Sequence, residues 1–124
     1  MMDKYRRAWA LRYLREAKAE LEAARKIPYM APSLVLEAIR KARNAIYYSL
    51  GEPAFIEIVI REATQKTQTI DDPVLRALVE IEGTVQQLMQ EEEVDGEKAM
   101  KQADNLVQLA SDIVETLTGE KIRD

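Results

Sequence analysis

A basic and aromatic segment, residues 40–48, carries the residue types best suited to bind a ligand. On a helix, cations spaced three or four residues from tyrosines share a face. Cationic and stacking groups together are typical of sites for RNA or a nucleotide. A solvated helix flank with tyrosines at the core edge would show the same pattern, so both interpretations stay open. The predicted ligand-binding residues are Arg40, Arg43, Asn44, Tyr47 and Tyr48.

A second candidate is the aromatic set Tyr5, Trp9 and Tyr13. Their spacing of four residues places all three along one side of a helix, offset from an apolar stripe that contains Ala10 and Leu14. A helix that is apolar on two faces is either deeply buried or meets a second chain. Tyr and Trp are also enriched at interfaces. We therefore predict a homodimer contact through these three residues.

The chain contains no cysteine and no histidine. These absences exclude disulfides, thiolate zinc sites and cysteine nucleophiles, and they remove the commonest general base. Ser33, Ser49 and Ser111 have no histidine to activate them, and the four glycines occur singly, so no glycine-rich phosphate loop exists. The sequence therefore predicts no catalytic residue and no cofactor.

Two pairs of acidic residues have a spacing that some all-α nucleotide pyrophosphatases use to hold magnesium. They are Glu92 with Asp95 and Asp112 with Glu115. Carboxylate oxygens are the ligands that Mg²⁺ prefers. An acidic chain often contains this spacing by chance, however, and neither pair has the expected flanking residues. We predict no metal site.

Charge is unevenly distributed along the chain. Residues 1–50 contain 11 Lys and Arg against five Asp and Glu, a net +6, whereas residues 51–124 contain seven against 17, a net −10. This asymmetry fits an acidic or nucleic-acid partner for the basic half, or two helical layers of opposite charge. No stretch of 18 apolar residues occurs, and early charges argue against a signal peptide, so we expect a cytoplasmic protein without membrane contact.

Length and periodicity indicate one all-α domain, residues 1–124, built as an antiparallel bundle of four to five helices. Apolar residues recur every three or four positions in four segments, and turn or capping signals separate them. Ser33 and Asp72 fit as N-caps, Gly119 fits as a stop, and residues 118–124 are expected to fray. Three of the predicted helices are 3–26, 33–50 and 97–117. The fourth begins at Pro73, after the Asp72 cap, and its buried face extends from Val74 to Leu88.

Residues 53–66 are ambiguous, because their β-branched run from Phe55 to Ile60 could form a strand. The same residues fit a helical face, and Pro53 suits the first turn of a helix. No second strand is available to pair with this segment. We therefore predict a fifth helix here.

Two segments within residues 10–53 carry a resemblance to a known family. The segment from Ala10 to Ala24 is similar to the opening helix of HEPN domains, and the alanine-rich segment from Leu36 to Pro53, which ends near a glycine, is similar to their second helix. The resemblance implies a helical bundle, usually dimeric. Many members partner a small nucleotidyltransferase, which also suggests a toxin–antitoxin pair, and some members are ribonucleases.

The ribonuclease members use an Arg followed, after four to six residues, by a His. Arg43 and Asn44 begin such a string, but Tyr48 stands where the His would fall. We therefore expect a non-catalytic relative that partners a nucleotidyltransferase or binds a nucleotide or RNA. A metal-dependent nucleotide hydrolase, a residual ribonuclease and a structural subunit of a larger assembly remain the alternatives.

Overall fold

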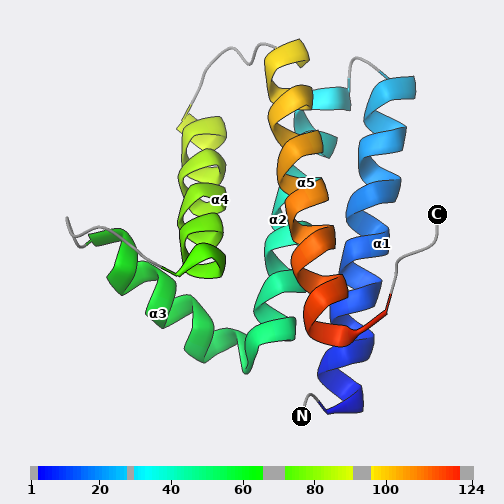
Figure 1. The fold of residues 1–124 in the computed structure, drawn as a ribbon. Helices are drawn as coiled ribbons and strands as arrows, with labels where there is room; N and C mark the ends of the chain where they lie inside the picture. Colours follow the sequence, from blue (N-terminus) through cyan, green and yellow to red (C-terminus); the bar gives the residue numbers. More distant parts are fainter. Residues whose placement is uncertain (1–2, 28–29, 66–71, 91–95, 121–124) are drawn as a thin grey trace.

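The computed structural model describes residues 3–27, 30–65, 72–90 and 96–120, and within them the chain forms five helices and no strand (Figure 1). This result confirms the predicted all-α class. In chain order the helices are α1 (Lys4–Lys26), α2 (Ala31–Leu50), α3 (Pro53–Gln65), α4 (Pro73–Gln90) and α5 (Gly96–Thr118).

Aspartates cap two of the helices. The Asp3 carboxylate accepts a hydrogen bond from the backbone N–H of Arg6 at 2.8 Å, and this bond lowers the pKa of Asp3. Asp72 accepts from the backbone N–H groups of Val74 and Leu75 at 2.8 and 3.1 Å, which confirms it as the N-cap of α4. Both carboxylates satisfy N–H groups that have no partner inside the helix.

The start of α2 differs from the prediction. The helix begins at Ala31, with Met30 as the N-cap residue, so Ser33 lies inside the first turn rather than capping it. Pro32 allows this earlier start, because the first turn of a helix has no carbonyl partner for its N–H groups and proline lacks that donor. At the other end of the chain, Gly119 has φ +75° and ends α5 as predicted.

The β-branched segment is helical, as predicted, and it forms α3 from Pro53 to Gln65. Ile60 is 2% exposed and anchors the helix to the core, whereas Phe55 and Ile58 are 64% and 51% exposed. The helix therefore lies on the surface and buries a narrow edge.

The main core lies between α1, α2 and α5, which stand side by side in Figure 1. Fully buried aliphatic side chains from all three helices fill it, among them Leu14, Ile39, Ile46 and Val114. Many of the buried residues between them are alanines, which let the helix axes approach closely. On the other side of α2 lies α4, which packs Leu78 and Ile81 against it.

The bundle is not antiparallel throughout. Figure 1 shows that α1 runs opposite to α2, while α2 and α5 run in the same direction. Two parallel neighbours need a connection that carries the chain back, and α3 with α4 supply it. This return path places α3 and α4 at the side of α2 away from α1, and they form the walls of a cleft.

No helix in the described parts of the chain is long and apolar enough to span a membrane. The described residues also contain no group of three acidic side chains placed to share a metal ion. Glu92, Asp95 and the tail 121–124 lie outside the described residues.

Candidate functional site

Helix α2 distributes the five predicted ligand-binding residues over different surroundings. Arg43 and Tyr47 contact α4, whereas Tyr48 contacts aromatic residues of α1. The Arg40 guanidinium lies 4.0 Å from the Glu37 carboxylate and 3.3 Å from the Met89 sulfur. Asn44 is half-buried. The predicted single surface is therefore two separate places, one on each side of α2.

On the α4 side, one carboxylate oxygen holds both α2 residues. Nη1 of Arg43 donates to Oε1 of Glu82 at 2.8 Å, and the hydroxyl of Tyr47 donates to the same oxygen at 3.1 Å. Arg43 and Tyr47 stand four residues apart on α2, so both side chains reach one point on the facing helix. The Arg43 and Glu82 side chains are only 22% and 21% exposed, which makes this a well-shielded ion pair.

The Tyr47 ring is part of the core, with 4% exposure. Burial raises its pKa above the ordinary tyrosine range, and the negative charge of Glu82 raises it further. The phenol is therefore neutral at pH 7 and serves as a hydrogen-bond donor. A ring so buried offers no free face for stacking, so Tyr47 takes part in the polar site only through the hydrogen bond of its hydroxyl to Glu82.

Beside this pair lies a cleft of about 410 Å³ between α2, α3 and α4. Its α3 wall carries Glu57, Arg61 and Gln65, while Glu82, Gly83 and Gln86 form the α4 wall. Arg61 lies within 3.4 Å of Glu57, and both side chains are mostly exposed. The lining thus combines two Arg–Glu pairs with two amides, and its formal charge is balanced.

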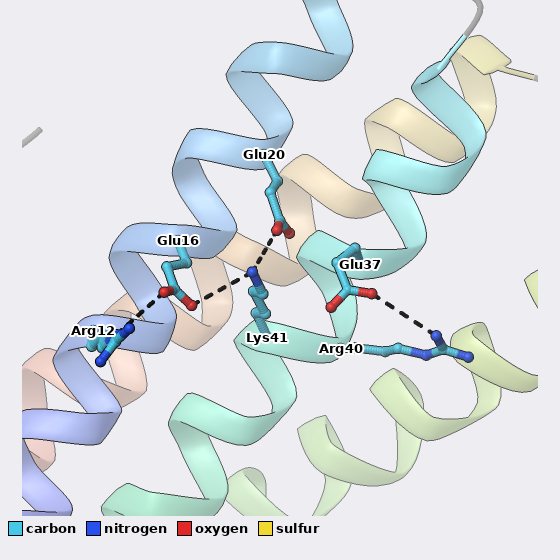
Figure 2. Close-up of polar contacts among 6 residues, drawn as sticks. All are labelled: Arg12, Glu16, Glu20, Glu37, Arg40 and Lys41. Atoms are coloured by element: carbon cyan, nitrogen blue, oxygen red, sulfur yellow. Dashed lines mark hydrogen bonds and ion pairs between the residues drawn. The ribbon is translucent and has the colours of Figure 1, made fainter.

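The basic cluster of α2 consists of Arg40, Lys41 and Arg43. On the α1 side, carboxylates neutralise its Lys41, as Figure 2 shows. The Lys41 ammonium lies 2.6 Å from the Glu20 carboxylate and 3.5 Å from that of Glu16, which in turn pairs with Arg12. The hydrogen bond to Glu20 raises the pKa of Lys41. Because each cation of the cluster has its own carboxylate, this part of α2 is not the cationic surface that a nucleic-acid backbone requires.

Tyr48 joins the three aromatic residues of α1, and we call Tyr5, Trp9, Tyr13 and Tyr48 the aromatic cluster. The Tyr48 ring stacks on both Trp9 and Tyr13, with centroid distances of 6.2 and 5.6 Å. Tyr5 meets the edge of Trp9 and is itself 66% exposed. Burial raises the pKa of the Tyr48 hydroxyl. The cluster is a set of mutually packed rings with one outer ring, that of Tyr5, open to solvent.

The buried serines serve the helices. Ser49 donates to the Ala45 carbonyl at 2.9 Å, and Ser111 lies 3.4 Å from the Glu115 carboxylate. Both hydroxyls are buried away from the cleft. Neither is placed as a nucleophile, and the residues that line the cleft suit binding.

Sequence reasoning missed Glu82 and Gly83, although each has a signal. Glu82 stands four residues after Leu78 and next to Ile81, at the edge of the buried face, where a carboxylate needs a partner. Gly83 interrupts a helical pattern that contains no turn. Only the tertiary structure shows that both residues line the same cleft as Arg43.

No protein-family model, curated protein or solved structure matches this chain. The protein, which forms five helices in the part of the chain that the structure describes, therefore has no family assignment.

Proposed function

We propose that this protein is a non-catalytic binding module that takes a nucleotide in the cleft between α2, α3 and α4. The observation that carries the proposal is the Arg43–Glu82–Tyr47 arrangement at the cleft wall. Two donors fix one carboxylate, and the carboxylate in turn fixes the guanidinium. Groups held in this way lose little freedom when a ligand binds.

The size and the chemistry of the cleft support a small ligand. Its volume of about 410 Å³ falls within the range of small-molecule sites, roughly 300–1,000 Å³. Nε of Arg43 is buried without a hydrogen-bond partner, so the guanidinium is not fully satisfied by Glu82. The absence of histidine and cysteine supports a binding role over a catalytic one. The resemblance of residues 10–53 to HEPN domains also supports a binding role, and it is part of the proposal.

Isothermal titration calorimetry with the four ribonucleoside monophosphates tests this function. We expect binding of at least one of them, and at least tenfold weaker binding for Arg43→Lys, which keeps the charge but loses the planar fork. Arg40→Lys is the matched control, because Arg40 pairs with Glu37 outside the cleft. Absence of binding at millimolar nucleotide, or equal affinity in all three proteins, would refute the proposal.

A second candidate function is association through the aromatic cluster, which the exposure of Tyr5 favours. We propose a second copy of this chain as the occupant, as the sequence already suggested. Light scattering after gel filtration should give a dimer mass that Trp9→Ala reduces to the monomer, while Phe55→Ala on α3 leaves it unchanged. A monomeric wild type that binds a nucleotidyltransferase through Trp9 would replace the homodimer with that partner.

A further inference from the structure

The local fold does not require a glycine at position 83. Gly83 lies in the middle of α4, its φ is not positive, and a Cβ added there would meet no atom within 4 Å. A glycine in a helix interior destabilises the helix relative to alanine. Neither backbone strain nor a close protein contact accounts for it. Gly83 lines the cleft together with Arg43 and Glu82. The missing side chain therefore leaves space for a ligand atom in the cleft, against the backbone of α4.

Glu82, the neighbour of Gly83, carries an oxygen that is free to accept a hydrogen bond. Its Oε1 already accepts from Arg43 and Tyr47, which saturates that oxygen. Its Oε2 has no hydrogen-bond partner among the described residues. Two donors therefore orient a carboxylate whose second oxygen can receive an N–H group and would repel a phosphate.

The rest of the lining has the same preference for a ligand with donors and acceptors. Gln65 and Gln86 each offer a side-chain N–H₂ and a side-chain oxygen, and no hydrogen bond joins either side-chain amide to another described residue. The pairing of Arg61 with Glu57 and of Arg43 with Glu82 leaves no net positive charge to attract a polyanion. A planar heterocycle that carries an amino group matches such a lining.

We propose that the cleft recognises its nucleotide by the base, with the exocyclic amino group on Oε2 of Glu82 and the ring against the bare backbone of Gly83. This inference rests on the proposed nucleotide function and names the part of the ligand that is read. It requires that nucleosides bind nearly as well as nucleotides, because the phosphate adds little. It also requires that a base without its amino group binds poorly, because Oε2 would then be desolvated without a donor.

Calorimetry with two matched pairs of nucleosides provides the test. Inosine lacks the 2-amino group of guanosine, and purine riboside lacks the 6-amino group of adenosine. We expect at least a tenfold affinity loss within one pair, and less than a threefold difference between that nucleoside and its monophosphate. Glu82→Gln should remove the difference within the pair.

Gly83→Ala keeps the test independent of the Glu82 variant. We expect it to melt no lower than wild type and to bind the same nucleoside at least tenfold more weakly, because the new methyl group occupies the space of the ring. Gly96→Ala is the matched control, since Gly96 begins α5 outside the cleft and a Cβ there also meets nothing.

The outcomes separate this inference from the function on which it rests. If nucleotides bind but nucleosides do not, or if Gly83→Ala binds as the wild type does, base recognition is wrong while the nucleotide function stands. If neither nucleosides nor nucleotides bind, both are wrong.

Discussion

The hydroxyl of Tyr47 donates a hydrogen bond to Oε1 of Glu82 at 3.1 Å, and this bond joins α2 to α4. It ties the edge of the main core to the helix that forms one wall of the cleft. Tyr47 is 4% exposed, so packing holds its ring in place independently of this bond. The core therefore orients the Glu82 carboxylate through the hydroxyl of Tyr47.

Tyr47→Phe removes the hydroxyl and keeps the ring. We expect a loss of about 1–2 kcal/mol in the free energy of unfolding, because a shielded hydrogen bond to a carboxylate disappears. Urea denaturation followed by circular dichroism measures this change. Tyr48→Phe is the control and should change the value by less than about 0.5 kcal/mol, since no hydrogen bond of its hydroxyl is present among the described residues. Equal losses in both variants would contradict the assignment.

Stability should fall as the pH rises above about 10. Folding raises the pKa of Tyr47 through burial and through the charge of Glu82, so the unfolded chain releases this proton first. Above the unfolded pKa the folded state binds more protons, and its advantage declines until the folded pKa is reached. Lys41, whose pKa is also raised, adds to the same decline. Urea midpoints from pH 8 to pH 11 should drop less steeply in Tyr47→Phe; an equal slope would argue against this origin.

Lys41→Met leaves Glu20 and Glu16 without their shared cation. The Lys41 and Glu20 side chains are 23% and 19% exposed, and Oε2 of Glu20 is buried without a hydrogen-bond partner. We expect a loss of about 1–2 kcal/mol at neutral pH, since a partly shielded carboxylate loses its charged partner. Thermal melting is the measurement. Arg61→Met, which breaks an exposed pair of α3, should cost less than about 0.5 kcal/mol.

Ile60→Ala tests how α3 is attached to the bundle. Ile60 is 2% exposed, and truncation of a buried isoleucine costs about 2–5 kcal/mol. Because α3 is a surface helix, we expect a value at the lower end, with faster hydrogen exchange in α3 than in α1 or α2. Phe55→Ala, at 64% exposure, should leave stability within about 0.5 kcal/mol of wild type. A large effect of Phe55 would mean that α3 buries the opposite face.

The sequence by itself determined the elements of the fold. Apolar spacing and local signals such as Asp72 and Gly119 are properties of neighbouring residues, so the helix starts could be placed to within about two residues. The helical state of residues 53–65 followed from Pro53 and from the lack of a partner strand. Ser33 was misplaced because Pro32 permits an earlier helix start, a local alternative that the pattern does not distinguish.

Only the tertiary structure decided which residues share a site. Arg43 and Tyr48 are five residues apart, and on a helix that spacing turns them to different sides, where α4 and α1 each supply a partner. Glu82 and Gly83 come from a helix some 40 residues later. Their approach to Arg43 depends on the path of α3 and α4 between two parallel helices. Contacts between residues far apart in the sequence set that path, so the spacing of neighbouring residues does not predict it.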